Sequence, residues 1–478
     1  MPGTLSDKAR HVRRWLQRSL KEFFGLPSVV VAGFVVLFVA VYAVDEWLWG
    51  PGGPVPLPWL ARLLGDASAI SDLLGTVATG MITVTSITFS LLLVAVQQTA
   101  ASLSTHVYDQ FIQRRSNQFS FGFFVGLSIF VLFTLATAGS SHRPVLGAAL
   151  SLAMAGLALC LVLILIYSTV DQMRPYSVIR AIHDLTLSAR DRERQRLAAT
   201  RRTVSPELSW SRLLRADRYG VVGRIDVARI ERMLADPAGR EAGGPARGRI
   251  EVEIVAATGT NLALRDPFVR LHAERPLSEE LCARLDAAVR AAIEIDSRRT
   301  LEGDAGFGVE QLCSIAWTTG STSKQNPQPA ILVCHCLRDL IARGTHATAV
   351  EASPSSRVVY RDRFVEDAVG ALTTIGVVSS ESLQNRLLSE VLRSLAALIE
   401  DAPADRLPLL TDPVPRLLSA LGDHVMTRDV EGSLSACEDA LRGRGATETA
   451  DALHEAAAGL GRSLGRLNSR GTRVPQSA

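Results

Sequence analysis

The sequence predicts an α-helical membrane protein with four transmembrane helices and a cytoplasmic α+β region, in which a small β barrel or sandwich unit is followed by helices. Of the 478 residues, 47% are hydrophobic and only 21% are charged, which is unusual for a soluble protein. The charges are also unevenly distributed. No formal charge lies between Asp72 and Asp109, Arg143 is the only one between Arg115 and Asp171, and the chain is charge-rich from Asp171 onward.

Composition excludes several classes for the chain as a whole. Its apolar content excludes a disordered chain and a purely soluble enzyme. Its six cysteines include no C-x-x-C pair, and their positions suit buried, reduced thiols. The net charge of +3 is too small to indicate nucleic-acid binding, and no G-x-x-x-x-G-K-[ST] loop is present. We therefore expect a lipid bilayer, and no nucleic acid, as a partner.

Four apolar segments are long enough to span a bilayer, which requires about 20 helical residues. They cover approximately residues 27–49, 70–100, 119–138 and 145–170. A basic segment, residues 1–26, precedes the first span, as in a signal peptide. The span is too long for a signal sequence, however, and Asp45-Glu46 occupies the place of a small-residue cleavage site. Residues 27–170 are therefore expected to form a four-helix transmembrane domain.

The arginines and lysines of the short loops predict the orientation, because these residues are enriched on the cytoplasmic side. Six of these residues precede the first span, and six arginines lie between the end of the fourth span and Arg196. The second loop contains Arg114 and Arg115, whereas the first and third loops contain only Arg62 and Arg143. This alternation predicts a multi-pass membrane protein with both termini and the second loop in the cytoplasm.

The second span is rich in small and polar residues. A spacing of three and four residues places several of them in one stripe along a helix, completed by Ile87 and Val94. The candidate pore-lining or helix-packing residues of this stripe are Thr76, Gly80, Thr83, Ser90 and Gln97.

Two interpretations of this stripe remain open. Small residues let helix backbones approach closely, so the stripe can be the packing seam of a bundle or a homo-oligomer. Alternatively, several copies of the helix line a hydrophilic path for an ion or small solute, with Gln97 at its cytoplasmic mouth. Asp45, Glu46 and Asp72 lie at span ends, and no ionisable residue lies deeper, which argues against a proton relay.

The remaining chain divides into four parts. Residues 171–216 are expected to form a cytoplasmic helical stalk with a kink at Pro175, and its arginine-dense run of residues 190–202 is interpreted as a solvated helix face. Residues 217–275 show strand patterns, such as the alternation of Ile250, Val252 and Ile254 with glutamates. Helical patterns return in 276–467, and residues 468–478 are expected to be a disordered tail.

Three of these segments resemble a family of predicted bacterial integral membrane proteins known as domain of unknown function 2254. Two stretches of the second span are similar to the family's G-S-M-I-T-V-A-G-I-V-F-S-I and V-A-L-Q. They are Gly80-Met-Ile-Thr-Val-Thr-Ser-Ile-Thr-Phe-Ser-Leu and Val94-Ala-Val-Gln. Tyr219-Gly-Val-Val-Gly-Arg-Ile-Asp and Phe307-Gly-Val-Glu-Gln-Leu-Cys-Ser-Ile-Ala are similar to S-G-Y-L-Q-x-I-D and F-G-I-R-Q-L-V-D-I-A. The resemblance implies a topology and a location in a bacterial inner membrane, and it implies no established activity.

One loop departs from the family pattern. The family's S-P-G-I-N-D-P-x-T-A corresponds here to residues 321–330, where Gln325 and Asn326 replace Asn and Asp, and Pro327 is kept. Gln325, Asn326 and Pro327 are therefore a candidate cytoplasmic loop site. If the family's carboxylate binds a metal or acts as a base, this chain has lost that function.

No catalytic, cofactor or metal site is expected. In Cys334-His335-Cys336, adjacent side chains on a helix point about 100° apart, so they cannot all bind one ion. No hydrolase, metalloprotease or dinucleotide motif is present, and the chain is not expected to be an enzyme. Two functions remain: a homo-oligomeric channel or transport protein whose polar second span faces the pore, or a membrane-tethered sensor or scaffold whose cytoplasmic domain binds a ligand or a protein.

Overall fold

The computed structural model describes residues 25–49, 59, 64, 66–102, 115–139, 143–172, 174–235, 249–321, 326–347, 355–380, 382–421 and 424–462. The chain divides into two compact units, Met1–Val178 and Ile179–Ala478, which are described separately below. The expected tail, residues 468–478, and most of the basic N-terminal segment lie outside the described residues.

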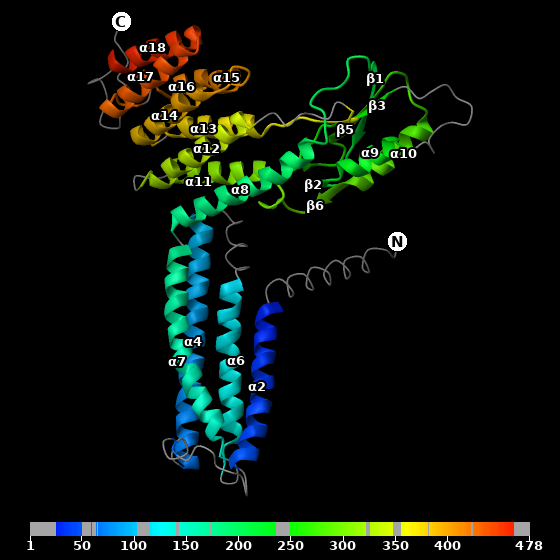
Figure 1. The fold of residues 1–478 in the computed structure, drawn as a ribbon. Helices are drawn as coiled ribbons and strands as arrows, with labels where there is room; N and C mark the ends of the chain where they lie inside the picture. Colours follow the sequence, from blue (N-terminus) through cyan, green and yellow to red (C-terminus); the bar gives the residue numbers. More distant parts are fainter. Residues whose placement is uncertain are drawn as a thin grey trace. The chain divides into compact units, whose positions relative to one another are not determined.

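The first unit contains four long apolar helices (Figure 1). They are α2 (Gly25–Trp49), α4 (Ala67–Ser102), α6 (Arg115–Thr137) and α7 (Val145–Gln172). Each is long and apolar enough to cross a membrane, which confirms the four expected spans. More than half of the α6 span is buried, whereas about a fifth of each other span is, because α6 packs against α2, α4 and α7.

Helix α6 approaches α2 through a G-x-x-x-G motif, a pattern that permits close helix packing in membranes. A Cβ atom on Gly122 would lie 2.8 Å from the Cα atom of Pro27, and one on Gly126 would lie 2.4 Å from the Phe34 ring. The Phe34 ring meets that of Phe123 edge to face, with centroids 5.4 Å apart. The close contact between α2 and α6 therefore requires glycine, which has no side chain, at both positions.

The second unit begins in α8 (Pro175–Leu197), whose first turn still belongs to the first unit. The sequence predicted a helical stalk with a kink at Pro175. In the structure, α7 ends at Gln172 and Pro175 is the first residue of α8. Proline is favoured at this position, because the first N–H of a helix has no intrahelical partner and the φ angle of proline already suits a helix.

In the described part of the second unit, seven strands form two sheets. The four-stranded sheet has the order β1 (Trp210–Arg215), β5 (Pro267–Ala273), β3 (Ile250–Ile254) and β7 (Val358–Tyr360), and the three-stranded sheet has the order β4 (Asn261–Leu262), β2 (Gly220–Ile225) and β6 (Ile293–Asp296). All pairs are antiparallel except β3 with β7. Apolar side chains of both sheets share one core with α9 (Val227–Ala235) and α10 (Glu279–Ala292).

This β unit extends beyond the expected range of 217–275. Strands β1, β6 and β7 lie outside that range, and the helix α9 lies within it. The short strands β6 and β7 have four and three residues, so neither carries an alternation long enough to be recognised without its sheet partner.

The remaining helices lie within residues 276–467, where the sequence predicted helices. They are α11 (Ala305–Ser321), α12 (Gln328–His346), α13 (Phe364–Val378), α14 (Asn385–Asp401), α15 (Leu407–Thr411), α16 (Val414–Leu421), α17 (Arg428–Gly443) and α18 (Thr447–Arg462). Strand β7 interrupts this helical series between α12 and α13 and returns to the sheet beside β3.

Candidate functional site: the polar face of the second span

The predicted stripe lies on the face of α4 that points away from the rest of the first unit. Its five candidate residues, Thr76, Gly80, Thr83, Ser90 and Gln97, are all exposed, as are Ile87 and Val94. The opposite face of α4 packs inward through Ile70, Leu74, Ala78 and Met81, which are at most 4% exposed. The five stripe residues thus share one face, and none of them is buried by the described part of the chain.

Threonine hydroxyls on this side of α4 donate hydrogen bonds to their own helix. Thr76 Oγ1 donates to the Asp72 carbonyl, Thr79 Oγ1 to the Gly75 carbonyl and Thr83 Oγ1 to the Thr79 carbonyl, each at 2.9 Å. A hydroxyl has one proton and two lone pairs, so these groups keep only acceptor capacity for a partner beyond the helix. The face therefore offers oxygen lone pairs and carries no formal charge.

The glycines of α4 differ from those of α6. A Cβ atom on Gly75 or Gly80 would meet nothing within 4 Å, whereas one on Gly122 or Gly126 would overlap α2. Close helix packing in the described part of the first unit thus uses the α6 glycines and leaves the α4 glycines open. The signal for the α6 contact, the Gly122-x-x-x-Gly126 spacing, is present in the sequence but forms no part of the predictions above.

Asp45 has a structural role at the end of its span. It lies in α2 and is 1% exposed, and its Oδ1 and Oδ2 atoms accept hydrogen bonds from the backbone N–H groups of Leu146 and Gly147 at 2.8 and 2.9 Å. The first N–H groups of a helix have no intrahelical acceptors, so Asp45 caps α7 from a different helix.

Replacing Asp45 with alanine is expected to destabilise the first unit by about 1–2 kcal/mol, because two N–H groups at the start of α7 lose their acceptors. Thermal aggregation of the purified protein in detergent measures this change. Asp72→Ala is the matched control, since the Asp72 carboxylate is exposed at the end of another span. Equal aggregation temperatures for the two variants would contradict the capping role.

The cysteine and histidine cluster separates in space. Cys334 is buried, Cys336 is half-buried, and the exposed His335 ring forms an ion pair with Glu390 at 3.2 Å. Burial raises the pKa of the Cys336 thiol to about 11 and also raises the pKa of Cys334, so both thiols are protonated at neutral pH. Within the described part of the chain, no three His, Cys, Asp or Glu side chains are grouped to hold a metal ion.

The candidate loop site is only partly described. Gln325 lies outside the described residues, whereas the Asn326 Oδ1 atom accepts a hydrogen bond of 3.0 Å from the Gln328 N–H, and Pro327 directly precedes α12. The Asn326 side chain therefore caps the turn that starts α12, an arrangement that suits a helix boundary.

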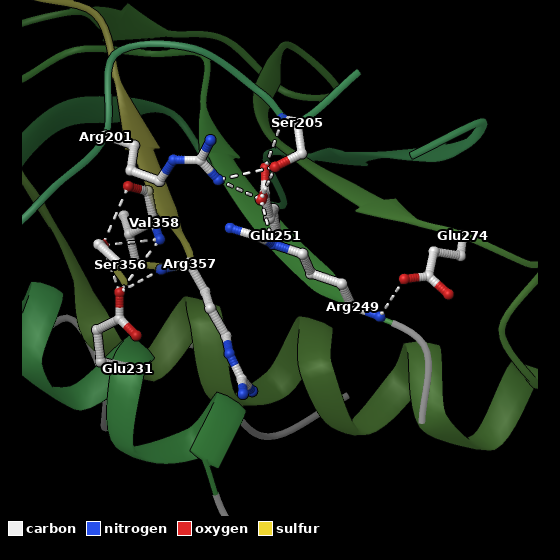
Figure 2. A network of polar contacts seen from close by, with 9 residues as sticks. All are labelled: Arg201, Ser205, Glu231, Arg249, Glu251, Glu274, Ser356, Arg357 and Val358. Carbon is white, nitrogen blue, oxygen red and sulfur yellow. Dashed lines mark hydrogen bonds and ion pairs between the residues drawn. The ribbon is translucent and has the colours of Figure 1, made fainter. Parts of the chain in front are cut away.

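A buried carboxylate lies at the centre of the polar network in Figure 2. Glu251 of β3 is fully buried and forms ion pairs with Arg201 at 2.5 Å and Arg249 at 2.8 Å, and its Oε1 atom accepts from the Ser205 hydroxyl at 2.6 Å. Burial raises the pKa of Glu251, but the Ser205 hydrogen bonds and the two arginines outweigh it and hold that pKa below its usual value.

A second part of this network anchors β7. Glu231 Oε1 accepts from the Ser356 hydroxyl and from the backbone N–H groups of Arg357 and Val358, at 2.5, 2.7 and 3.2 Å (Figure 2). On the other side, the Arg201 N–H donates to the Val358 carbonyl at 2.8 Å. These groups hold β7 in the sheet, so we assign the network to folding.

Helix α8 is firmly packed within the second unit. The Arg190 guanidinium makes two hydrogen bonds to Asp362, at 3.0 and 2.6 Å, pairs with Glu193 and lies 4.6 Å from the centre of the Phe364 ring. The expectation of a solvated arginine face is therefore wrong for Arg190, which is 9% exposed. Part of the expected stalk is thus an integral helix of the second unit.

No curated protein and no solved structure matches the chain. Residues 21–374 match the family described as predicted membrane protein (DUF2254), which confirms the resemblance inferred from the sequence, while α14 to α18 lie beyond the match. With four membrane-spanning candidates and a match over most of its length, the chain belongs to the DUF2254 family of predicted membrane proteins.

Proposed function

We propose that this protein is a homo-oligomeric channel or transport protein of a bacterial inner membrane, with both termini in the cytoplasm. In this arrangement, the polar face of α4 surrounds the symmetry axis and lines a path for an ion or small solute. The observation that supports the proposal is that the whole stripe, from Thr76 to Gln97, is exposed in the single chain.

The chemistry of the polar face of α4 suits a monovalent cation or a neutral solute. Thr76 and Thr83 donate their protons to backbone carbonyls, so they present oxygen lone pairs, which attract cations and repel anions. The stripe carries no carboxylate or ammonium group that would bind an ion tightly. A monovalent cation or a neutral hydrogen-bonding solute would therefore pass more readily than an anion.

The proposal is tested by flux measurements on the full chain in liposomes, with separate gradients of a monovalent cation, an anion and a neutral solute. We expect Thr83→Leu and Ser90→Leu to reduce flux about tenfold, because each adds an apolar side chain to the path, and tenfold corresponds to about 1.4 kcal/mol in the barrier. Thr83→Ser keeps a hydroxyl and should keep the flux. Val36→Leu, on the exposed side of α2, is the control for a lipid-facing change.

The oligomeric state of the same samples distinguishes this function from the alternative. An oligomer that supports no flux under any of the three gradients would contradict the channel. If that impermeable oligomer retains a specific partner through its second unit, the protein is a membrane-tethered sensor or scaffold instead. In neither function does the second unit carry out a catalytic step.

A further inference from the structure

The most exposed large apolar side chains in the described part of the second unit lie on two neighbouring turns. Tyr219, in the β1–β2 turn of residues 216–219, is 77% exposed, and Leu264, in the β4–β5 turn of residues 263–266, is 66% exposed. Val255, at 40%, follows the β3 residue that pairs with Val269 near the start of β5, at the same end of the four-stranded sheet. We call these two turns the sheet tip.

The sheet tip is rigid. The Ala216 N–H donates to the Asp266 carbonyl and the Arg265 N–H donates to the Ala216 carbonyl, both at 2.8 Å, so the two turns are bonded to each other. The Ala263 N–H also donates to the Asp266 carboxylate at 2.7 Å. Tyr219 and Leu264 are therefore held in position in the free protein and require little ordering when they bind.

Basic side chains surround these apolar groups. The Arg215 guanidinium donates to the Arg265 carbonyl at 2.9 Å, and that of Arg290 donates to the Arg215 carbonyl at 2.7 Å, so both arginines are fixed beside the turns. Arg218 and Arg265 are exposed on the turns themselves. Four arginines (Arg215, Arg218, Arg265 and Arg290) and three aspartates (Asp217, Asp266 and Asp286) give the tip a net charge of +1. Arg290 pairs with Asp286 at 2.7 Å and with Asp217 at 3.3 Å, so the excess positive charge comes from the other three arginines.

We propose that the sheet tip docks on an anionic lipid surface, with Tyr219 and Leu264 entering the interface between headgroups and acyl chains. Tyrosine suits this zone because it has an apolar ring and a polar hydroxyl, and arginines are attracted to the negative charge of anionic headgroups. Two apolar side chains are too few for a stable protein interface, which requires roughly 800 Å² from each partner. They suffice here because the four spans tether the second unit to the bilayer and raise its effective concentration at that surface.

Amide hydrogen exchange on the full chain in nanodiscs tests this docking. The nanodiscs contain phosphatidylcholine alone or phosphatidylcholine with phosphatidylglycerol, and the protein in detergent is the lipid-free reference. We expect the amides of residues 216–219 and 263–266 to exchange about tenfold more slowly in the anionic nanodiscs than in either other sample. Exchange of the β5 amides should be the same in all three and verifies that the sheet remains folded.

Two pairs of substitutions separate the apolar and electrostatic contributions. Tyr219→Ser with Leu264→Ser, and Arg218→Glu with Arg265→Asn, should each abolish the protection; asparagine is chosen because residue 265 has a φ of 74°. Trp317→Ser is the control, because Trp317 is an exposed large apolar residue of α11 and belongs to neither turn. Equal exchange in all three samples would overturn the proposal, and so would protection that depends on protein concentration in detergent, since it would identify a second copy as the partner.

Discussion

Replacing Gly122 with leucine is expected to destabilise the first unit more than any other single change discussed above. The new Cβ atom alone would lie 2.8 Å from the Pro27 Cα atom, which is backbone and cannot rotate away. Helices α2 and α6 would have to separate, and overpacking of this kind costs about 1–3 kcal/mol before the loss of neighbouring contacts is counted. The aggregation temperature of the purified protein in detergent should fall by several degrees.

The matched control is Gly80→Leu, the same substitution in another span. A Cβ atom on Gly80 would meet nothing within 4 Å, so the leucine should not disturb the helix packing of the single chain. The aggregation temperature of this variant should therefore equal that of the wild type. If the proposed function is correct, this variant instead changes the oligomer or its flux, because Gly80 lies on the polar face of α4. A similar loss of thermal stability in both variants would contradict the assignment of close packing within the chain to α6.

Replacing Glu251 with glutamine is expected to have the largest effect in the second unit. The buried carboxylate balances the positive charges of Arg201 and Arg249. Removing one partner of a buried ion pair lowers the free energy of unfolding by about 3–5 kcal/mol. The side chains of the two arginines are 19% and 39% exposed, so water screens part of the loss and we expect about 2 kcal/mol. Glu294→Gln, in the exposed pair with Arg224, should change the stability by less than about 0.5 kcal/mol.

A native cysteine reports this loss. Cys282 lies in α10 and is 1% exposed, so the rate at which a maleimide labels it measures opening of the β unit. Labelling of Cys282 should be about 30-fold faster in Glu251→Gln, which corresponds to about 2 kcal/mol. Cys437, buried in α17, serves as an internal reference for the helical region.

The effect of Glu251 should also depend on pH. Its pKa in the folded protein is held below the ordinary value, so the carboxylate contributes stability above the ordinary pKa of a glutamate, and this contribution is lost as the pH falls toward the folded pKa. The difference in Cys282 labelling between the wild type and Glu251→Gln should therefore shrink on acidification below about pH 4. A difference that stays constant on acidification would show that the glutamine acts through packing.

Long, strongly patterned elements could be predicted from the sequence. The four spans and the helices α11 to α14 and α16 to α18 have enough turns for an apolar pattern to be recognised. The three-residue strand β7 could not be predicted, because it is defined by its pairing with β3, about a hundred residues earlier in the chain.

The contacts of single side chains were less predictable than the elements. The stripe on α4 could be located from its spacing, but an apolar helix can turn any face inward, so the exposure of Thr83 and Ser90 required the structure. Similarly, Asp45 could be identified as a carboxylate at a span end, whereas its bonds to residues about a hundred positions later follow from tertiary packing. Spacing in the sequence determines which residues share a face, and packing determines where that face points.

The parallel pairing of β3 with β7 has a consequence for synthesis of the chain. The sheet cannot be completed until Tyr360 has left the ribosome, so β1, β3 and β5 are exposed while α11 and α12 are being made. Pairing across such a long separation closes a large loop and is slow compared with helix formation. A nascent chain stalled before residue 358 should therefore be protease-sensitive in its β unit, whereas one stalled beyond α13 has every strand that the sheet requires.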